Sequence, residues 1–258
     1  MALQDPSRPA SWQRSALRMA ALVLLCAAAL QAAFALRIAA MRFVDPSSTA
    51  FQRSEAWRLL HRDASLPTWR RQWTDLPRIS PHLQRAVIAS EDADFARHGG
   101  VDWASIEAAW GRNQRTQARL LNDAAKRSVR ASNASTRLVG GSTISQQLAK
   151  NLFLSGERTV VRKAQEFVIT MMLEALLPKR RLLEIYLNSV EWGEGVFGAE
   201  AAAQRHFRTA ASRLTPSQAA RLAVMLPAPK RFEKQLRSAY LDDRTATIVA
   251  RMGAADLP

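Results

Sequence analysis

The sequence predicts a mainly α-helical fold that follows one membrane-spanning helix. Its apolar residues recur mostly at helical spacing, and the 258 residues include only 10 glycines and 11 prolines. No alternating apolar and polar run is long enough to predict a β-strand. A run of 18 residues without charge lies near the N-terminus. These observations predict one helical domain of ordinary to large size behind a membrane anchor.

The charge-free run Met19–Leu36 is the first element, bounded by Arg18 and Arg37. A helix of this length spans ~27 Å, close to the hydrocarbon thickness of a bilayer. Two interpretations stay open, an uncleaved anchor and a signal peptide cut near a small-x-small site at 33–35. We favour the anchor because residues 38–41 extend the apolar run. Arginines before the run favour a cytoplasmic N-terminus, and arginines after it weaken that orientation.

Between the anchor and the domain, residues 42–76 carry three tryptophans among many arginines. Such a segment suits a membrane interface, and a linker whose tryptophans pack in a core is an equally good interpretation. Ser80-Pro81 then predicts a helix start, because proline fits the first helical position, and this helix places Glu91 at its C-terminal end. A capping aspartate predicts a short helix over 102–110.

The next segment, 112–137, is polar and holds seven lysines and arginines against one acid. We expect a mobile loop or a frayed helix there. Five helices are predicted after it from capping residues, apolar spacing and the prolines that end them. They cover Ile144 to about Leu154, Thr159–Leu177, 179–188, 199–207 and a last helix that starts at Thr215-Pro216 and stops at 226–229, with a glycine-punctuated turn at 191–198.

Residues 89–102, ASEDADFARHGGVD, concentrate three acids, Glu91, Asp92 and Asp94, beside two glycines. The chain as a whole is strongly basic, with a net charge of +15. A carboxylate at the end of an apolar helix could act as a general base, and an ordinary helix end would have the same composition. The pattern alone leaves both interpretations open.

A second candidate cluster lies after residue 140, where a Gly-Gly pair precedes a helix N-terminus that could bind an anion. Four cations follow within fourteen residues, and two helices that meet near 155–156 could aim several of them at one anion together with Glu166. They are Lys150, Arg158, Arg162 and Lys163. The alternatives are plain helix capping and surface ion pairs between Glu166 and cations three and four residues before it.

Composition narrows the function classes. A single cysteine, Cys26, excludes a disulfide framework, and the four scattered histidines do not form a zinc-binding pattern. The basic charge calls for an anionic partner, which could be nucleic acid, anionic lipid or a phosphorylated substrate. No helix-turn-helix, RNP or zinc signature is present, so no nucleic-acid partner is expected.

A carboxylate-rich turn, a cationic cluster, a second carboxylate and a membrane anchor together suit glycosyl transfer from a diphosphate. Cations can stabilise a diphosphate leaving group, so one carboxylate suffices as the base for the attacking hydroxyl. A glycosidase, by contrast, needs a second carboxylic acid that protonates its leaving group.

Five blocks resemble, in the same order, the motifs of the family 51 peptidoglycan glycosyltransferases, over roughly residues 77–250. They read ASEDADFARHGGVD (89–102), GGSTISQQLAKNLFL (140–154), RKAQE (162–166), LLEIYLNSVEWGEGVFGAEAAAQRHF (182–207) and RLAVMLPAP (221–229). The resemblance implies an all-α, lysozyme-like domain of two lobes with a cleft between them, the smaller lobe facing the membrane. It also implies an activity: polymerisation of lipid II into β-1,4-linked glycan strands, with inversion and release of undecaprenyl diphosphate.

The same resemblance implies roles for individual residues. Glu91 would be the general base, and Glu166 a second important glutamate near the diphosphate or a divalent cation. The expected substrate-binding residues are Asp92, Ser142, Thr143, Gln146, Gln147, Lys150, Asn151, Arg158, Arg162 and Lys163. Tyr186, Asn188 and the glycines at 193, 195 and 198 are expected to be structural. No cofactor is obligatory from the sequence, although Mg²⁺ or Mn²⁺ could lie at the diphosphate, and no metal ligands are assigned.

The expected organisation is a cytoplasmic tail at 1–18, an anchor at 19–41, a juxtamembrane segment at 42–76 and the glycosyltransferase domain at 77–258. Neither Ser-x-x-Lys nor Lys-Thr-Gly occurs, so we expect a monofunctional enzyme without penicillin-binding chemistry. The expected location is the bacterial inner membrane, crossed once, with the domain on the periplasmic side. Expected partners are lipid II, the growing glycan strand and the membrane, with cell-division and penicillin-binding proteins as candidates.

The segment 112–137 is longer than the resemblance leads us to expect, and its basic charge could bind anionic lipid. Two other function classes stay open. A lytic transglycosylase of lysozyme-like fold would release fragments from finished glycan. A basic membrane-anchored scaffold protein would have no need of the intact Glu91 and Glu166.

Overall fold

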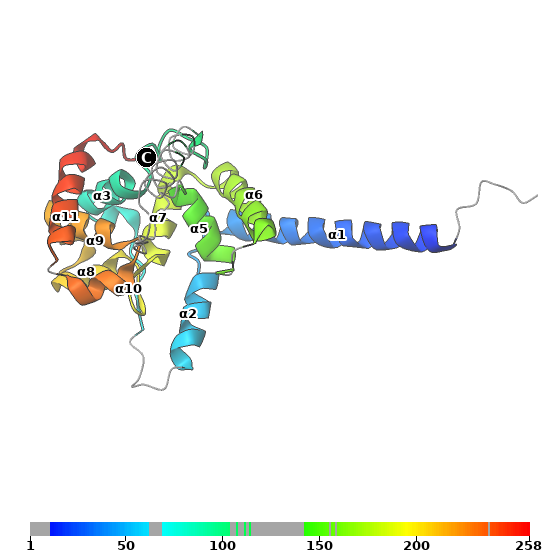
Figure 1. Ribbon diagram of the computed structural model, residues 1–258, viewed down its shortest axis with the longest axis horizontal. Helices are drawn as coiled ribbons and strands as arrows, with labels where there is room; N and C mark the ends of the chain where they lie inside the picture. The colour runs from blue at the N-terminus through cyan, green and yellow to red at the C-terminus, as the bar shows by residue number, and fades with distance from the viewer. Residues whose placement is uncertain are drawn as a thin grey trace, which may run out of the picture.

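The computed structural model describes residues 11–61, 69–103, 107, 111, 114, 142–154, 156–157, 159–236 and 238–258. The short helix predicted over 102–110 and the basic segment 112–137 fall almost entirely outside this part of the chain, as does Arg158. Helices dominate the part that is described, so the predicted all-α class is confirmed (Figure 1).

The described helices are α1 (Ser11–Ala40), α2 (Ala50–Leu60), α3 (Pro81–Glu91), α5 (Ile144–Phe153), α6 (Val160–Leu176), α7 (Lys179–Ser189), α8 (Ala199–Phe207), α9 (Pro216–Met225), α10 (Pro229–Phe232) and α11 (Ala239–Arg251). Helices α3 and α5 to α9 begin and end close to the predicted residues. Helix α1 begins eight residues before the predicted charge-free run, and α2, α10 and α11 were not predicted. Pro81 takes the first position of α3 after the Ser80 cap. Thr143 and Thr215 form capping boxes at the starts of α5 and α9. These local signals explain why the predicted starts are confirmed.

Three very short strands add a small sheet that the sequence pattern did not predict. β1 (Arg70–Arg71) pairs in parallel with β3 (Val196–Phe197), and β3 pairs antiparallel with β2 (Glu191–Gly193). The hairpin of β2 and β3 occupies the glycine-punctuated turn expected at 191–198. Strands of two or three residues are too short to show an alternating pattern, because alternation needs at least four residues to be readable.

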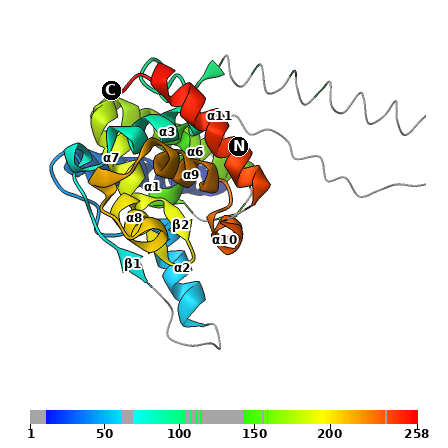
Figure 2. The same ribbon diagram turned by 90° about the vertical axis from the view of Figure 1, so that its left-hand side faces the viewer.

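Two groups of helices flank α7 (Figures 1 and 2). On one side α3, α9 and α11 pack on one another, with α8 and α10 beside them. On the other side α5 packs on α2 and α6, and α1 packs on α6. Helix α7 contacts both groups, and its side chains Leu182, Ile185 and Leu187 are fully buried in the hydrophobic core. This arrangement is the two-lobed one that the resemblance implied.

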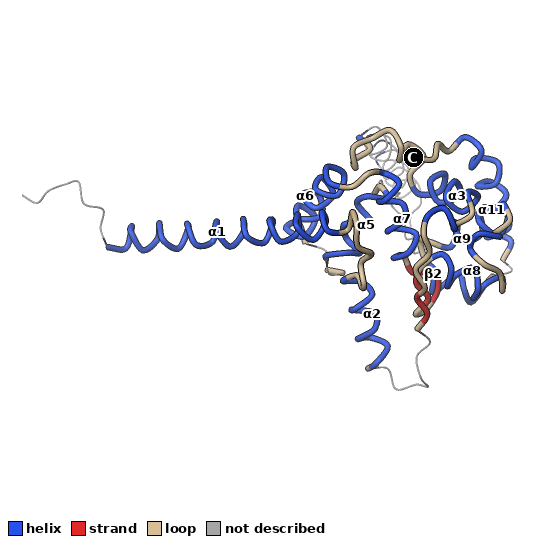
Figure 3. The backbone as a smooth tube through the Cα atoms, turned by 180° about the vertical axis from the view of Figure 1, so that it is seen from behind, coloured by secondary structure: helices blue, strands red, loops and turns tan. Residues whose placement is uncertain are grey.

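The N-terminal helix α1 extends away from the rest of the molecule (Figure 3). It is the one helix in the described ranges that is long and apolar enough to cross a membrane. Its side chains are exposed from residue 12 to residue 30, and the following turns meet the domain. Gln31 and Gln165 exchange two hydrogen bonds of 2.8 and 3.0 Å, and Phe34 packs edge-on against Phe153. The C-terminal turns of α1 are therefore attached to α5 and α6.

The segment 42–76 belongs to the folded unit, although the sequence placed it ahead of the domain. Helix α2 packs on α5, and the Gln52 side chain donates to the backbone oxygen of Ser189 over 3.3 Å. The backbone of Thr74 exchanges two hydrogen bonds with the Asn188 side chain, at 2.8 and 2.9 Å. One tryptophan of the segment packs against the core, and the other two are 67% and 42% exposed. These contacts also give Asn188 the structural role expected of it.

Gly100 occupies a turn in which a side chain would not fit. Its φ is +91°, a left-handed conformation that glycine adopts without steric cost. A Cβ atom there would lie 2.8 Å from Glu174 Cγ and 2.9 Å from Thr170 Cγ2. The carbonyl oxygen of Gly100 accepts a 2.6 Å hydrogen bond from Thr143 Oγ1. This turn therefore helps to fix the start of α5.

Replacing Gly100 with alanine should destabilise the fold. The strained φ and the two close contacts should together cost about 1–3 kcal/mol, seen as a lower melting temperature of the detergent-solubilised protein. Gly99→Ala is the matched control, because a Cβ at Gly99 meets nothing within 4 Å. Equal melting temperatures for the two variants would contradict this account of the turn.

Candidate active site

A cavity of about 460 Å³ opens between α2, α5 and α6. Its lining residues are Phe51, Ser54, Glu55, Ser142, Gln146, Gln147, Lys150, Leu154, Gly156, Arg162, Lys163 and Glu166. Cations from α5 and α6 form one wall, and α2 forms the opposite wall. This volume lies in the range of cavities that bind small molecules or head groups.

Glu166 is buried in the cavity wall and is held by two cations of its own helix. Its carboxylate oxygens accept hydrogen bonds of 2.7 Å from Arg162 Nη1 and 2.5 Å from Lys163 Nζ. The predicted spacing of three and four residues produces these contacts. The Glu166 side chain is only 5% exposed, so the cluster is more than a surface ion pair.

Two cationic side chains that line the cavity have donor atoms without a partner among the described residues. Arg162 Nε is buried without a hydrogen bond, and Lys150 forms no ion pair with any residue that the structure describes. Partial burial lowers the pKa of Lys150, Glu166 acts against that shift, and Arg162 and Lys163 add to it. Lys150 is exposed to the solvent of the cavity, whereas Arg162 Nε is a buried donor without a partner, which is costly. This wall is therefore suited to an anionic ligand that would supply acceptors to both groups.

Glu91 lies half-buried at the C-terminal end of α3, as the sequence predicted. Its Oε2 accepts a 2.9 Å hydrogen bond from Gln147 Nε2, and Gln147 also lines the cavity. Burial raises the pKa of Glu91, hydrogen bonds from Gln147 and Ser90 lower it in part, and the charge of Asp92 raises it again. A carboxylate with a raised pKa is a better proton acceptor than an exposed one.

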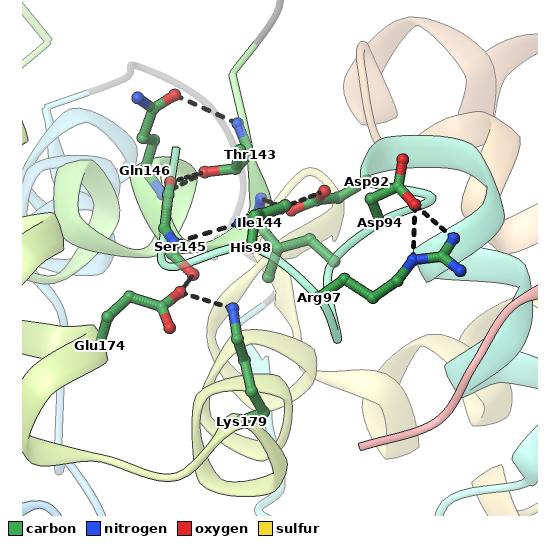
Figure 4. A network of polar contacts seen from close by, with 11 residues as sticks. Asp92, Asp94, Arg97, His98, Thr143, Ile144, Ser145, Gln146, Glu174 and Lys179 are labelled. Atoms are coloured by element: carbon green, nitrogen blue, oxygen red, sulfur yellow. Dashed lines mark hydrogen bonds and ion pairs between the residues drawn. The ribbon is translucent and has the colours of Figure 1, made fainter. Parts of the chain in front are cut away.

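Asp92 is buried beside Glu91, and both of its oxygens are occupied (Figure 4). Oδ2 accepts a 3.0 Å hydrogen bond from the backbone N–H of Ile144, the first residue of α5, and Oδ1 lies 2.7 Å from His98 Nε2. The backbone N–H of Gly100 donates to His98 Nδ1 over 3.1 Å, so the other ring nitrogen must carry the proton that points at Asp92. Asp92 thus ties α3 to the N-terminus of α5, where the helix dipole favours an anion.

A second group of polar contacts holds α5 from the side of α6 and α7 (Figure 4). Ser145 Oγ donates to Glu174 Oε1 over 2.5 Å, and Lys179 Nζ donates to the same oxygen over 2.9 Å. These residues come from α5, α6 and α7 in turn. The helix that carries Gln147 and Lys150 is therefore bonded to α6 through Glu174, which Lys179 of α7 holds in turn.

The structure brings most of the predicted site residues together. Those that line the cavity are Ser142, Gln146, Gln147, Lys150, Arg162, Lys163 and Glu166. Asp92 and Thr143 are buried just outside it and hold the start of α5. Asn151 does not line the cavity. Glu91 reaches the cavity through Gln147, and Arg158 lies outside the described residues.

Sequence reasoning missed the wall that α2 contributes. Phe51, Ser54 and Glu55 line the cavity from this helix, more than 80 residues before the cationic wall. A local signal for the helix existed, because Thr49 and Gln52 have the spacing of a capping box and form one. No motif indicated that this helix would face the site.

A group of charged side chains attaches α2 to β2 and α10. Lys230 Nζ donates to Glu55 Oε2 over 2.5 Å and lies 3.5 Å from Glu191 Oε2. Burial raises the pKa of Glu191 to about 7, with nearby Glu55 adding to the shift and Lys230 acting against it. Lys230 therefore lies between the carboxylates of Glu55 and Glu191, and Glu191 is the one that takes up a proton near neutral pH.

Asp92→Asn should destabilise the site although it keeps the side-chain shape. An amide offers one acceptor to two donors, the Ile144 N–H and the His98 ring N–H, so one buried donor loses its partner. Moving the ring proton to the other nitrogen would leave the Gly100 N–H unpaired instead. We expect a loss of about 1–3 kcal/mol in unfolding free energy, measured by thermal or denaturant unfolding.

The control for this change is Asp94→Asn, two residues along the same turn. Asp94 pairs with Arg97 in an exposed contact, in which the aspartate side chain is 49% exposed. Such pairs contribute about 0–1 kcal/mol. Similar losses for both variants would mean that Asp92 does not hold the start of α5.

The family model described as transglycosylase matches residues 62–253. A protein named biosynthetic peptidoglycan transglycosylase from Burkholderia thailandensis is 51% identical over 230 residues, which cover 89% of this chain and 82% of that protein. Proteins of the same name are 47% identical in Paraburkholderia xenovorans, over 93% of this chain and 92% of theirs, and 48% identical in Bordetella pertussis, over 83% and 82%. The chain belongs to the transglycosylase family.

Proposed function

We propose that the chain is a peptidoglycan glycosyltransferase that polymerises lipid II into β-1,4-linked glycan strands. The observation that carries this proposal is one half-buried carboxylate, Glu91, joined through Gln147 to a cavity with a cationic wall. The cationic cavity would bind the diphosphate of the donor, and the carboxylate would take the proton of the acceptor hydroxyl. The names of the relatives support the same activity.

The diphosphate of the donor lies against Lys150, Arg162 and Lys163. The buried Arg162 Nε and the ammonium of Lys150 are donors that the described protein groups leave free for it. Negative charge grows on the diphosphate as the glycosidic bond breaks, and fixed cations stabilise that charge where it develops. The leaving group therefore departs without a general acid.

Glu91 accepts the proton of the attacking hydroxyl. Its raised pKa strengthens it as a base, and the hydrogen bond from Gln147 holds the carboxylate in place. Attack from the face opposite the diphosphate inverts the anomeric centre and gives the β linkage. Because protonated Glu91 cannot act as a base, the rate should fall at acid pH, over a range above the 4.5 of an ordinary glutamate.

Glu166 positions cations and does not act as an acid. Its two oxygens accept hydrogen bonds from Arg162 and Lys163, so the contacts of this carboxylate are with the cations of the cavity wall. Glycan cleavage needs a proton donor, so this arrangement supports transfer over the lytic alternative. Incubating the purified protein with lipid II and with finished glycan separates the two, since chain growth supports transfer and fragment release supports cleavage.

The chain acts at the bacterial inner membrane, crosses it once through α1, and places its domain on the periplasmic side. The length and apolar surface of α1 support the crossing, and a lipid-linked donor requires a membrane site. Cell-division and penicillin-binding proteins are the proposed protein partners, because their reactions use the same growing glycan. The scaffold alternative is disfavoured by an ordered Glu91 next to the cavity.

Substituting the proposed base should remove polymerisation while leaving the fold intact. Glu91→Gln keeps the shape and cannot take a proton, so we expect at least about a 10²–10⁴-fold loss of lipid II turnover with an unchanged melting temperature. Lys150→Ala should lose about 10²–10³-fold, as expected for one donor to a developing charge. The control is Lys234→Ala, which removes an exposed lysine away from the cavity. A folded Glu91→Gln protein with normal turnover would falsify the assignment.

A divalent cation is not required for this reaction in our proposal. Mg²⁺ or Mn²⁺ at the diphosphate would need Glu166, and both oxygens of that carboxylate already accept from cations. Polymerisation by the purified protein should therefore persist after treatment with a chelator. Loss of activity with EDTA, and its return with Mg²⁺ or Mn²⁺, would overturn this prediction.

A further inference from the structure

We propose that the buried phenol of Tyr186 is a positioning residue, which fixes the Gln147 amide so that its nitrogen faces Glu91. The inference rests on the proposed role of Glu91 as the base. It assigns to Tyr186 a part in the reaction, whereas the sequence indicated only a structural one. The evidence is a line of two hydrogen bonds across three helices.

The two bonds share the Gln147 side chain. The Tyr186 hydroxyl, on α7, donates to Gln147 Oε1 over 2.9 Å, and Gln147 Nε2, on α5, donates to Glu91 Oε2 over 2.9 Å. Tyr186 is completely buried, and its ring is packed in the hydrophobic core. The phenol therefore has a fixed place from which it holds one end of the amide.

The amide can satisfy both neighbours in one orientation. A phenol hydrogen needs an acceptor, and a carboxylate can only accept, so the amide oxygen must face Tyr186 and the amide nitrogen must face Glu91. The flipped amide would set its oxygen against the Glu91 carboxylate and would leave the phenol hydrogen without its acceptor. Rotation about the last bond of a glutamine side chain is otherwise nearly two-fold, so without the phenol both orientations are accessible.

The phenol remains a donor throughout the working pH range. Complete burial raises the pKa of Tyr186 well above 10, and the charges of Glu91 and Asp92 raise it further. The groups that act on Glu91 are Ser90 of α3, Asp92 directly after that helix, the neutral Gln147 of α5 and Tyr186 of α7. Of these, only Gln147 links the carboxylate to the cavity.

The bond from Gln147 stabilises the ionised form of Glu91, because a donor favours the charged carboxylate over the neutral acid. Losing that bond for part of the time must raise the pKa of Glu91. The acid limb of the pH–rate profile then moves to higher pH, while the rate well above that limb recovers toward the wild-type value. If the Tyr186 phenol only filled space, its removal would change the stability of the fold and would not move the acid limb of the pH–rate profile.

Tyr186→Phe tests this distinction, since it removes one oxygen atom and keeps the ring. Gln147 lines the cavity, so water can reach the amide oxygen that loses the phenol, and the variant should fold. We expect the acid limb of the kcat/KM profile for lipid II polymerisation to move to higher pH by about half a unit to one unit. This shift corresponds to part of the free energy of a hydrogen bond to a charged group, because the freed amide keeps that bond for only part of the time. Tyr240→Phe is the matched control, because Tyr240 is the other tyrosine of the chain and is 55% exposed.

A double-variant cycle isolates the link through the amide. Gln147→Met should raise the acid limb at least as far as Tyr186→Phe does, and adding Tyr186→Phe to Gln147→Met should move it no further. A Tyr186→Phe enzyme with an unmoved limb, or shifts that simply add, would overturn the proposal. Failure of the wild-type protein to polymerise lipid II would instead reject the proposed function, so the two failures can be told apart.

Discussion

The hydrogen bond between the Asp92 carboxylate and the backbone N–H of Ile144 is the contact on which the rest of the site depends. It joins the end of α3 to the beginning of α5, and these two helices carry the proposed base and the groups that surround it. The bond is held in turn by His98, whose ring is oriented by the backbone of Gly100. A left-handed glycine, a histidine of one tautomer and a buried aspartate thus form one unit. Without it, the register of α5 relative to the base would not be defined.

The site separates two kinds of charge that would otherwise neutralise each other. Glu166 pairs with Arg162 and Lys163 and holds those cations at the cavity wall, and no cation is among the groups that act on the base. Glu91 is instead bonded to a neutral amide and lies in a partly buried position. A cation bonded to Glu91 would lower its pKa and weaken it as a proton acceptor. Gln147 therefore suits its place because it can orient a carboxylate without cancelling its charge.

How much could be predicted from the sequence depended on how local each signal was. The starts of α3, α5 and α9 followed from caps and prolines within four residues, and the acids and cations of the site followed from short motifs. The wall formed by α2 could not be predicted, because its place beside α5 is set by contacts such as that of Gln52 with Ser189, over 130 residues away. For the same reason only a structural role is expected of Tyr186 from the sequence. Its hydroxyl gains a role only when α7 brings it next to Gln147.

The apolar helix α1 and the cationic wall are connected by direct contacts. Helix α1 meets α6 through the paired amides of Gln31 and Gln165, and it meets α5 through Phe34 and Phe153. Helix α6 begins with the cations that face the cavity, so these cations are fixed relative to the apolar helix. A lipid-linked diphosphate stays at the membrane surface, because its chain cannot leave the bilayer. A site that must receive it gains from being held at a set distance from the anchor, and the contacts of α1 with α5 and α6 provide that fixed distance.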